Sequence, residues 1–420
     1  MKILVVGGGG RENALIWKIS QSKRVKKIWA APGNVGSADL AESLDIKTAN
    51  VVELADFAKE EQIDLTVVGP EQPLALGIAD EFNRRNLKIF GPSQKAAMIE
   101  SSKAFAKEFM KKNSIPTAEY QVFDNPLEAL QNLEQAAYPR VLKVDGLAAG
   151  KGVFICSSFA EAQEPITAAM VEKKFGHAGN RLVVEEFLSG QELSFMVISD
   201  GKRVVPLVTS QDYKKLLDRD EGPNTGGMGA ISPAPQVDEE LFARIMKTII
   251  RPTIDGLRFE NREFRGVLYA GLMVNRGEPK VLEFNARFGD PETQAIMLRL
   301  KSDLVDLLEG SADGNLFDCP VEWSENVSAC VVLAGKGYPQ KTENGARIKG
   351  LERAKALGLE VFHAGTALED GELVTAGGRV LNVCAQAPTM RETIGKIYDG
   401  ISFITFSNMY FRQDIGRTKQ

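Results

Sequence analysis

Short apolar runs alternate with amphipathic stretches along the first hundred residues. The runs KILVVG, KKIWAA, DLTVVG and KIFG have the length and composition of buried strands. Amphipathic helices are expected between them, at residues 11–20, near 51–61 and near 74–86. This alternation predicts a doubly wound parallel sheet, in which ligands bind beyond the carboxyl ends of the strands.

The connections around this sheet carry signals of their own. Asn50, three residues before Glu53, predicts a capping box at the second helix. The loops at the carboxyl ends of the strands, 7–11, 31–36 and 69–74, hold most of the glycines and prolines of this region. We therefore expect ligand contacts in these three loops.

The pattern changes beyond residue 100. A helical stretch at 101–113 stops before Pro116, and residues 120–188 follow the order strand, helix, strand, glycine-rich loop, strand, helix, strand, which predicts a small separate lobe. Asp200-Gly201 and residues 275–277 then lie between apolar runs as hairpin turns, so the next sheet is expected to be antiparallel or mixed. After a linker near 313–325, strands and glycine-rich turns followed by a helix at 390–400 predict a small β-rich C-terminal domain.

Length and composition limit the class of protein. A chain of 420 residues is longer than one hydrophobic core usually supports, so two to four domains that share clefts are expected. No run approaches the ~18 consecutive apolar residues of a membrane helix, so we expect no membrane insertion. The N-terminal run lacks the basic start and the cleavage site of a secretory signal, which predicts a cytoplasmic protein.

Charge and residue usage exclude several kinds of site. The net charge of −5 and the dispersed lysines and arginines argue against a nucleic-acid partner, whereas a small anionic substrate needs only a local cluster. The four cysteines lie far apart without a C-x-x-C pair, so we interpret them as buried thiols rather than disulfides or zinc ligands. With only two histidines in the chain, any metal is expected to be a hard cation held by oxygens.

The glycine turn at residues 7–10 follows a strand and opens a helix. Its N–H groups can face an anion at the positive end of that helix, beside Arg11. Glu12 and Asn13 stand where a dinucleotide fingerprint needs its third glycine, so a nicotinamide dehydrogenase is excluded. A phosphate site is favoured, and a plain tight turn is the alternative.

A second glycine-rich loop runs from Gly146 to Gly152, with Lys143 on the strand before it. It is not a P-loop, because three residues rather than four separate its first glycines and Gly152 follows Lys151 where Ser or Thr is needed. Such a loop can fold over a triphosphate while its N–H groups and a lysine neutralise the charge. A hairpin without a function is the alternative.

The strand sequence around Glu283 places oxygen donors two residues apart. Residues two apart in a strand share a face, so Glu283 and Asn285 present a carboxylate and an amide oxygen side by side, with Arg287 next. This pattern is typical of a magnesium and phosphate site, in which an arginine braces the transferred group. An exposed polar strand face is the alternative.

Two further segments and one lysine have the composition of binding elements. The apolar strand at 183–188 can pair its backbone with an adenine edge while Glu192 takes ribose hydroxyls; a solvated lobe hinge is the alternative. Residues 211–229 form a long polar, glycine-rich segment, typical of a functional loop unless it is disordered. Lys103 opens a helix, where the dipole disfavours a positive charge, which indicates another task.

Taken in order, these elements resemble the ATP-grasp enzymes, in which two lobes clamp ATP and magnesium helps to activate a carboxylate as an acyl phosphate. Within that superfamily the chain is similar to the phosphoribosylamine-glycine ligase family over nearly its whole length. The similar runs are GGGGREN, APGN, VGPEQPL, IFGPS, SKAFAK, DGLAAGKGV, EEFLSGQE, SQDYK, GPNTGGMGA, YAGLM, EFNARFGDPETQ and KSDL. The pair RFGDPE and GPNTGGMGA is the most specific.

The resemblance implies a fold and a reaction. The α/β fold would comprise an N-terminal doubly wound domain (1–102), a central ATP-grasp lobe (103–120 and 189–325), a small ATP-grasp lobe (121–188) and a C-terminal domain (326–420), with α+β character in the two lobes. The reaction would join glycine to 5-phosphoribosylamine, giving glycinamide ribonucleotide, ADP and phosphate through glycyl phosphate in purine biosynthesis. It implies Mg²⁺ or Mn²⁺ as cofactor, these small molecules as the only partners, and a monomer or weak homo-oligomer.

The resemblance also implies roles for individual residues. ATP would be held by Lys103, Lys143, Gly146, Gly150, Lys151, Gly152, Val153, Glu185, Glu186, Phe187, Leu188 and Glu192. The other two substrates would be held by Gly10, Arg11, Gly69, Pro70, Glu71, Asn224, Thr225, Gly226, Gly227 and Asp290. Glu283 and Asn285 would bind the metal, and Lys143, Asp212 and Arg287 would act in catalysis.

Two residues depart from the family pattern, and two other functions compete with this one. Asn13 and Tyr213 stand where histidine is common, which puts any histidine-assisted step in doubt. Another ATP-grasp ligase, such as a D-alanine-D-alanine ligase, is not expected to share RFGDPE and GPNTGGMGA. An inactive nucleotide-binding sensor would not need Lys143, Glu283, Asn285 and Arg287 together.

Overall fold

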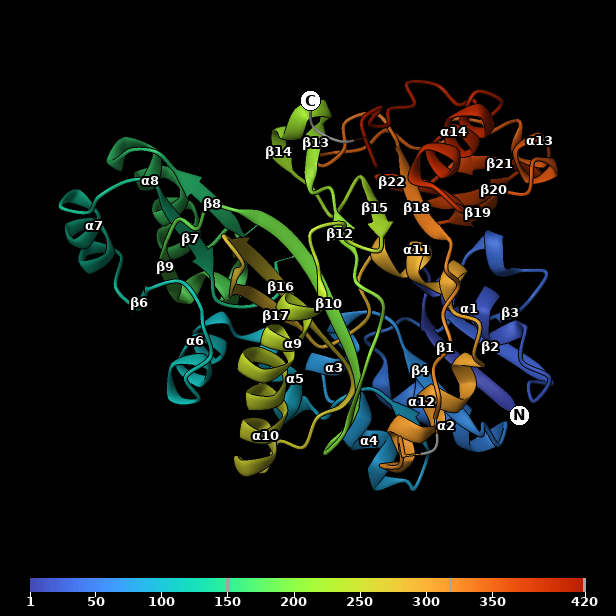
Figure 1. Ribbon diagram of the computed structural model, residues 1–420, viewed down its shortest axis with the longest axis horizontal. Coiled ribbons are helices and arrows are strands. Elements are labelled where there is room, and N and C mark those ends of the chain that lie inside the picture. The colour runs from blue at the N-terminus through green and yellow to red at the C-terminus, as the bar shows by residue number, and fades with distance from the viewer. Residues whose placement is uncertain (149–151, 318, 418–420) are drawn as a thin grey trace.

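The computed structural model describes residues 1–148, 152–317 and 319–417. In Figure 1 a lobe built from residues 120–186 projects to one side of the molecule, while the N-terminal sheet and the C-terminal elements lie together at the other side. The central strands and helices connect these parts.

The N-terminal part is a five-stranded parallel sheet in the order β3-β2-β1-β4-β5. Its elements are β1 (Lys2–Gly7), α1 (Gly10–Ser20), β2 (Lys27–Pro32), η1 (Val35–Ser37), β3 (Glu42–Ser43), α2 (Val51–Glu60), β4 (Leu65–Val68), α3 (Glu71–Ala75), α4 (Ile78–Arg84) and β5 (Ile89–Phe90). Ile3 lies in the same buried cluster as Leu15 of α1, whereas Leu4, the next residue, lies in the cluster of Leu54 from α2. Helices therefore cover both faces, which explains the continuous apolar run of β1 and confirms the doubly wound sheet.

Two helices differ from the sequence-based expectation. The single helix expected near 74–86 is divided into α3 and α4, because Gly77 between them has a φ of +83° and interrupts the right-handed helix. The helical stretch at 101–113 is α6 (Lys103–Lys112), preceded by α5 (Gln94–Ser101). Between these two helices, the Ser102 hydroxyl accepts the N–H of Phe105 as the cap of α6.

The capping box predicted at α2 is wrong. Asn50 does stand before the helix, but its side chain makes no capping hydrogen bond. Its amide nitrogen donates instead to Glu53 Oε2 at 2.8 Å. The two side chains therefore satisfy each other rather than the backbone at the helix start.

The projecting lobe has the predicted order of strands and helices. Its sheet runs β6-β9-β7-β8 and is antiparallel. The elements are β6 (Tyr120–Phe123), α7 (Pro126–Glu134), β7 (Arg140–Val144), β8 (Val153–Cys156), α8 (Phe159–Ile166), η2 (Thr167–Val171), η3 (Gly176–Asn180) and β9 (Leu182–Glu186). Leu142, Ala162 and Val184 belong to a buried cluster within the lobe, so it has its own core.

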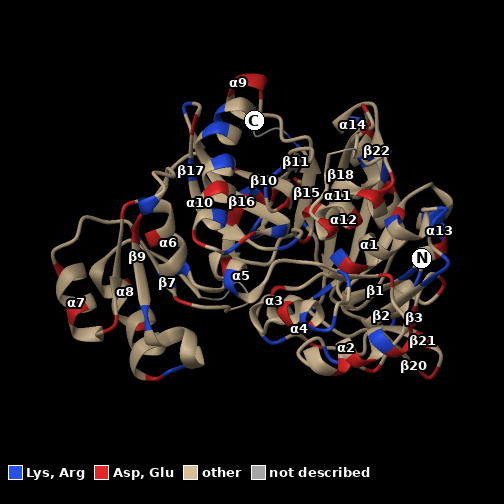
Figure 2. Ribbon diagram, turned by 90° about the horizontal axis from the view of Figure 1, so that it is seen from below, with Lys and Arg blue, Asp and Glu red and all other residues tan. Residues whose placement is uncertain are grey.

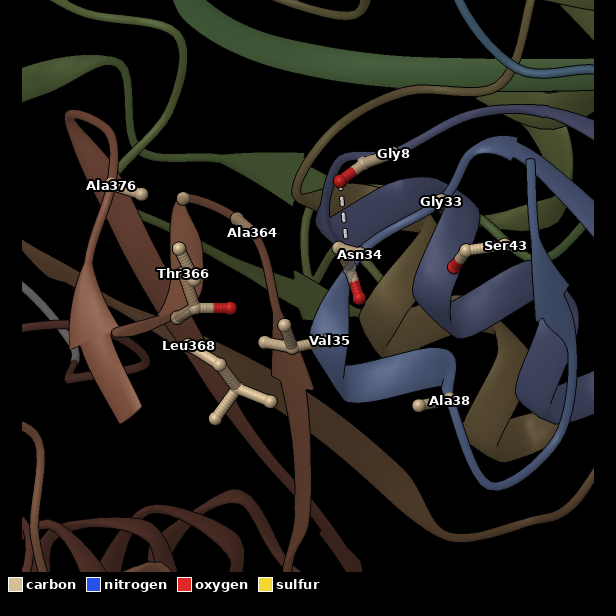
Figure 3. A pocket seen from close by; sticks show the side chains of 12 residues that line it. Gly8, Gly33, Asn34, Val35, Ala38, Ser43, Ala364, Thr366, Leu368 and Ala376 are labelled. Carbon is tan, nitrogen blue, oxygen red and sulfur yellow. Dashed lines mark hydrogen bonds between the residues drawn. The ribbon is translucent and has the colours of Figure 1, made fainter. Parts of the chain in front are cut away.

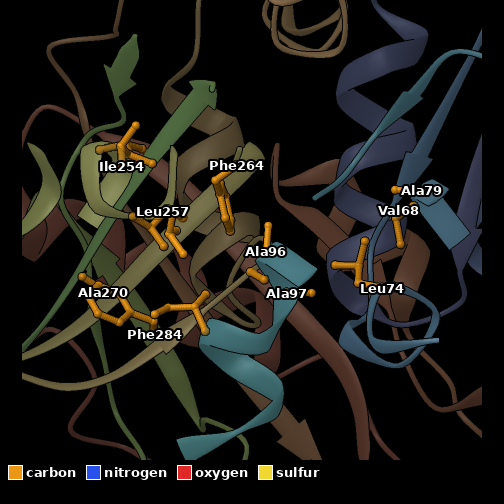
Figure 4. Close-up of a cluster of buried hydrophobic side chains, with 14 of the residues drawn as sticks. Val68, Leu74, Ala79, Ala96, Ala97, Ile254, Leu257, Phe264, Ala270 and Phe284 are labelled. Atoms are coloured by element: carbon orange, nitrogen blue, oxygen red, sulfur yellow. The ribbon is translucent and has the colours of Figure 1, made fainter. Parts of the chain in front are cut away.

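The central sheet is antiparallel, in the order β11-β10-β16-β17. Its elements and the helices around it are β10 (Gln191–Asp200), β11 (Val204–Pro206), α9 (Glu239–Ile245), η5 (Met246–Ile250), α10 (Arg251–Phe259), β16 (Arg265–Asn275), β17 (Glu278–Asn285), α11 (Glu292–Arg299) and α12 (Leu304–Asp313). Both predicted hairpin turns fall between paired strands. Figure 4 shows Ala96 and Ala97 of α5 between Leu74 of the N-terminal part and Phe284 of β17, within one continuous buried cluster. This shared core fixes β17 against the N-terminal sheet.

The C-terminal sheet incorporates strands from the middle of the chain. Its order is β12-β15-β18-β22-β19, and β15 pairs antiparallel with β18. The elements of this region are β12 (Gln211–Asp212), β13 (Lys215–Leu217), η4 (Asp218–Asp220), β14 (Glu221–Asn224), β15 (Gly229–Ser232), β18 (Val327–Ala334), α13 (Leu351–Ala356), β19 (Glu360–His363), β20 (Thr366–Glu369), β21 (Glu372–Thr375), β22 (Arg379–Ala387) and α14 (Met390–Ile401). The polar segment at 211–229 is thereby attached to the C-terminal sheet.

Several expectations from composition can be compared with the structure. Cys156, Cys330 and Cys384 are buried, but Cys319 is partly exposed, so the expectation of buried thiols is wrong for that residue. Positive and negative side chains are interspersed over the ribbon in Figure 2. Within the described ranges, no helix is both long enough and apolar enough to span a bilayer.

Candidate active site

Strand β17 carries the predicted oxygen donors on one face. Glu283 and Asn285 pair with Gly271 and Tyr269 of β16, and Phe284 between them is buried in the core. Because side chains alternate along a strand, Glu283 and Asn285 point together to the face opposite Phe284. The two side chains therefore share a face, as the sequence predicted. The alternative, an exposed polar strand face, does not apply, because Asn285 is only 9 % exposed.

Four positive side chains surround Glu283. Burial raises the pKa of this carboxyl, but Lys214, Lys143 and Lys103, with a smaller effect of Arg287, lower it further, so its pKa lies below the ordinary value. The carboxylate is thus ionised at neutral pH. The three lysines and Arg287 provide the positive charge that is needed to bind an anionic ligand such as a polyphosphate.

Glu283 and Asn285 are suited to bind a hard divalent cation whose remaining coordination positions are filled by a bound ligand. A carboxylate and an amide oxygen are hard donors, as Mg²⁺ and Mn²⁺ prefer. Among the described residues, no group of three or more His, Cys, Asp or Glu side chains could hold a metal. An ion at Glu283 and Asn285 therefore needs further oxygens, which phosphates and water supply.

Lys143 is held in place from both sides. Its Nζ donates to the carbonyl of Leu282 (2.9 Å), the residue that a register shift leaves without a partner on β16. It also lies 3.0 Å from Glu185, which in turn lies 3.0 Å from the Nζ of Lys107. Burial lowers the pKa of Lys107 to about 8, although Glu185 raises it. The Glu185 carboxylate is therefore engaged inside the protein, where it aligns Lys143 toward β17.

The other described residues that are expected to bind ATP lie in the lobe, lie next to it in the chain, or are bonded to its glycine-rich loop. Lys103 donates to the carbonyl of Gly146 (3.0 Å), so α6 is bonded to the glycine-rich loop. Glu186 pairs with Lys280 of β17 (2.9 Å) and Glu192 with Lys214 (3.4 Å). Phe187 is exposed, Leu188 and Val153 are half-buried, and Gly152 is buried. Gly150 and Lys151 lie outside the described residues.

Arg287 joins β17 to the N-terminal part. Its guanidinium lies 3.2 Å from Glu71, at the start of α3, and 3.2 Å from Glu100 of α5. It also donates to the carbonyl of Phe288 (3.2 Å), as does Arg11 from α1 (3.1 Å). Two arginines from different parts of the chain therefore meet at one carbonyl.

The turn at residues 7–10 already holds a negative group. Glu12 accepts the N–H of Gly9 (2.6 Å) and the Nε of Arg11 (2.6 Å), so a carboxylate occupies the helix start where the sequence predicted a phosphate. Gly69 closes this space, since a Cβ there would lie 2.1 Å from Glu12 Oε1. A Cβ on Gly10 would likewise lie 2.2 Å from Asn382 Nδ2 of β22. A phosphate bound here would have to share the turn with Glu12.

Asp212 and Glu292 form an acidic pair near Lys214. Asp212 Oδ1 is buried and, among the residues that the structure describes, has no hydrogen-bond partner. Burial and the charge of Glu292 raise the pKa of Asp212 well above its ordinary value. Glu292 accepts hydrogen bonds from Tyr269 (2.5 Å) and Ser194 (3.0 Å). A buried acceptor without a donor is a natural contact for a ligand N–H.

The loop at 224–227 lies beside Asp212. Thr225 hydrogen-bonds the carbonyl of Lys214 through both its N–H and its hydroxyl (2.8 Å each). Gly227 has a φ of +112°, and a Cβ there would lie 2.8 Å from Asp212 Oδ1 and 2.4 Å from Pro291 Cδ. Asp290, next to Pro291, pairs with Arg379 of β22 (3.1 Å). The predicted substrate residues of this region are thus brought together, with Arg379 added.

Sequence reasoning missed several residues of the site. Lys214 and Glu292 lie inside runs that were recognised, SQDYK and RFGDPE, so their proximity to candidate residues was the available signal. Lys107 and Tyr269 likewise lie in the recognised runs SKAFAK and YAGLM, whereas Arg379 lies outside all of these runs and carried no signal of its own.

Asn13 and Tyr213, which stand where histidine is common in the family, both make hydrogen bonds within the structure. Asn13 Oδ1 accepts the N–H of His363 (2.7 Å), and Tyr213 packs in the C-terminal core while its hydroxyl accepts the N–H of Gly416 (3.1 Å). Both side chains therefore act in contacts between the C-terminal domain and the rest of the chain.

A separate cavity of about 550 Å³ lies between the N-terminal loops and the C-terminal hairpin β20-β21. Figure 3 shows Val35 and Leu368 beside it, and the Asn34 side chain donating to the Gly8 carbonyl (2.9 Å). Its lining contains none of the charged groups around β17. The chemistry described above therefore lies elsewhere.

Comparison with known proteins identifies the family. Models of phosphoribosylglycinamide synthetase match three successive segments: the N domain at 1–100, the ATP-grasp (A) domain at 101–293 and the C domain at 328–418. The phosphoribosylamine-glycine ligase of Caldanaerobacter subterraneus subsp. tengcongensis is 49 % identical over 415 residues, 99 % of each chain. That of Escherichia coli K12 is 48 % identical over 420 residues, covering 99 % of this chain and 98 % of the relative.

Solved structures agree at the level of the fold. The crystal structure of phosphoribosylamine-glycine ligase from Thermotoga maritima superposes with a TM-score of 0.87 at 33 % identity, covering 99 % of this chain and all of that one. A biotin carboxylase domain from Hydrogenobacter thermophilus, solved with MgADP, has a TM-score of 0.75 at 15 % identity and covers 98 % of this chain and 91 % of that one, which shows the shared ATP-grasp fold. The chain belongs to the phosphoribosylamine-glycine ligase family.

Proposed function

We propose that this chain catalyses the ATP-dependent ligation of glycine to 5-phosphoribosylamine, giving glycinamide ribonucleotide, ADP and phosphate. The observation that carries the proposal is the near-identical length and 49 % identity shared with relatives named for this reaction. The geometry around β17 supplies groups suited to the chemistry.

The first step makes the glycine carboxylate reactive. An amine cannot displace oxygen from a carboxylate, so we infer that one oxygen attacks the γ-phosphorus of ATP to form glycyl phosphate. Lys143, Lys103 and Arg287 neutralise charge on the transferred group. Glu283 and Asn285 would hold Mg²⁺ or Mn²⁺, which when bound offsets the charge of the phosphates. The loop from Gly146 to Gly152 and Val153 would cover the phosphates.

Different segments of the chain would hold the nucleoside and the other two substrates. Glu186, Phe187, Leu188 and Glu192 at the end of the lobe are proposed to contact the nucleoside, and Glu185 to act through Lys143. The loop 224–227 and Asp290 would surround glycine. Gly10, Arg11, Gly69, Pro70 and Glu71 would face phosphoribosylamine.

The second step is attack by the amine of phosphoribosylamine on the acyl phosphate. The amine loses a proton as the C–N bond forms and phosphate leaves. Asp212, a buried carboxylate with a raised pKa and no partner for its Oδ1 within the described chain, is the proposed acceptor for an amine N–H. Enclosure of the intermediate keeps water from hydrolysing it.

The direct test is an assay of purified protein with ATP, glycine and freshly generated phosphoribosylamine. We expect ADP release that depends on all three substrates and stops when any one is omitted. ATP binding without turnover would support the sensor alternative and overturn the proposal. ADP release with another carboxylate or amine, but not with these two, would indicate a different ATP-grasp ligase.

A further inference from the structure

Two side chains of the C-terminal domain bind the loop residue Gly226. The hydroxyl of Tyr338 accepts its N–H at 2.9 Å, and Arg379 Nη1 donates to its carbonyl at 2.7 Å. These residues lie 112 and 153 positions further along the chain. Both backbone polar groups of a single loop residue are therefore engaged by one distant domain.

Arg379 also contacts Asp290, in the connection between β17 and α11. Its Nη1 also donates to the carbonyl of Asp290 (2.8 Å), and its Nη2 lies 3.1 Å from Asp290 Oδ2. Asp290 Oδ1 accepts from Gln294 (2.8 Å), so the carboxylate is fixed at both oxygens. Burial raises the pKa of Asp290, but Arg379 and Arg11 lower it further, which keeps it ionised and paired. One guanidinium thus bridges Gly226 and Asp290.

Thr225 anchors the start of the loop to the Lys214 carbonyl (2.8 Å each from its N–H and its hydroxyl), whereas Gly226 itself is held, among the described contacts, by Tyr338 and Arg379. Gly226 is exposed and has no side chain, so it buries little apolar surface, and such segments are ordered chiefly by polar contacts. A Cβ on Gly226 would lie only 3.2 Å from Arg379 Cζ and 3.3 Å from the Tyr338 hydroxyl. Tyr338 is itself confined by Gly378, where a Cβ would lie 2.4 Å from its ring. The two side chains therefore approach the loop from a constrained direction.

The position of Gly226 determines what Asp212 faces. Gly227, the next residue, is the one whose Cβ position lies 2.8 Å from Asp212 Oδ1. A shift of Gly226 would move Gly227 relative to that carboxylate, whereas the groups that face ATP, Lys143 and Lys103, have no bond to the loop among the described contacts. The link from the loop to the proposed ATP residues runs through Thr225, which is bonded to Lys214, the partner of Glu192, rather than through Gly226.

We propose that Arg379 and Tyr338 are positioning residues through which the C-terminal domain holds the loop 224–227 and Asp290 in place to bind glycine. The proposal rests on the proposed function, because the loop, Asp212 and Asp290 are its glycine residues. The two side chains act on binding of the small substrate rather than on the phosphates of ATP.

Steady-state kinetics test this division of roles. Arg379→Gln should raise the KM for glycine by about 10- to 100-fold, as expected for lost charge-assisted hydrogen bonds, while the KM for ATP changes less than about twofold. Tyr338→Phe should raise the KM for glycine less, because water can replace its hydroxyl at the exposed loop. The double variant should show less than the product of the two effects, since both contacts act on Gly226. Arg353→Gln, an exposed arginine of α13 in the same domain, is the matched control and should match the wild type.

Hydrogen exchange tests the contact without turnover. The peptide containing Gly226 should exchange faster in both variants, while a peptide from β7 in the lobe should not. Unchanged exchange at the loop, an unchanged KM for glycine, or equal changes in the KM values for glycine and ATP would overturn the proposal. Failure of the wild type to ligate would refute the proposed function instead, and the exchange result would still decide whether the contact orders the loop.

Discussion

His363 lies where the C-terminal domain meets the N-terminal loops. The residue is 7 % exposed, and its ring packs against Gly36, where a Cβ would lie 2.3 Å from the His363 Cγ. Its Nδ1 lies 3.1 Å from the Thr366 hydroxyl, and its carbonyl accepts from Asn34 (2.9 Å). Burial, with a smaller contribution from the charge of Lys355, lowers its pKa from 6.5 to about 4. The folded protein therefore favours the neutral ring.

This shift makes stability depend on pH in a defined direction. The unfolded chain takes up the proton near pH 6.5, before the folded protein does, so the stabilisation is complete above pH 6.5 and is lost as the pH falls from 6.5 through 4. A difference of about 2.5 units corresponds to about 3 kcal/mol at most. About 2 kcal/mol of this should be lost between pH 8 and pH 5.

The assay is urea unfolding at pH 8 and at pH 5, with the free energy of unfolding compared between variants. His363→Gln removes the titrating ring, so its stability should fall about 2 kcal/mol less than that of the wild type over this range. His177, the other histidine of the chain, is exposed, and His177→Gln is the matched control that should behave as the wild type. Equal pH dependence in the wild type and His363→Gln would refute the reasoning, as would an NMR titration in which the His363 ring protonates near pH 6.5.

Three experiments with substituted proteins test other parts of the account. Glu283→Ala should lower turnover by about 100-fold or more with the fold intact by circular dichroism, since it removes a proposed metal ligand, and wild-type ADP release by a folded variant would end that assignment. Gly227→Ala should lower the free energy of unfolding by about 1–3 kcal/mol, because a side chain is strained at a φ of +112° and would also meet Pro291. Gly395→Ala, at an open position of α14, should instead raise the free energy of unfolding by about 1 kcal/mol. Denaturant midpoints that shift in the same direction in both variants would contradict this contrast. Lys107→Met should lower the free energy of unfolding by about 3 kcal/mol, because it leaves the buried Glu185 carboxylate with one lysine partner. Adding Glu185→Gln to this variant should recover part of the loss. A double variant that is less stable than Lys107→Met alone would argue against the buried ion pair.

Local patterns predicted the parts of the fold that depend on neighbouring residues. The alternation of apolar runs and amphipathic stretches was sufficient for the parallel sheet, and the turn residues for the central hairpins. Strand periodicity was sufficient to place Glu283 and Asn285 on one face. Each of these follows from residues within a few positions of one another.

Contacts between segments that are far apart in the sequence could not be predicted from local patterns. The spacing of the turn at 7–10 predicted an anion site, but only the structure shows that Glu12 folds back into it. Glu185 was expected to face the nucleoside, whereas it lies between Lys143 and Lys107. The addition of β12 and β15 to the C-terminal sheet likewise depends on pairing across about a hundred residues, which no local pattern encodes.

The most direct test of the central claim follows an oxygen atom. If glycyl phosphate forms, glycine labelled with ¹⁸O in its carboxylate must transfer one labelled oxygen to inorganic phosphate in each turnover, with ADP as the nucleotide product. In the proposed site, the positive charge of Lys143, Lys103 and Arg287 would surround the terminal phosphate and favour attack at that phosphorus. Mass spectrometry of the phosphate should therefore show one ¹⁸O per glycinamide ribonucleotide formed. Unlabelled phosphate, or AMP as the main product with the label in AMP, would contradict the account.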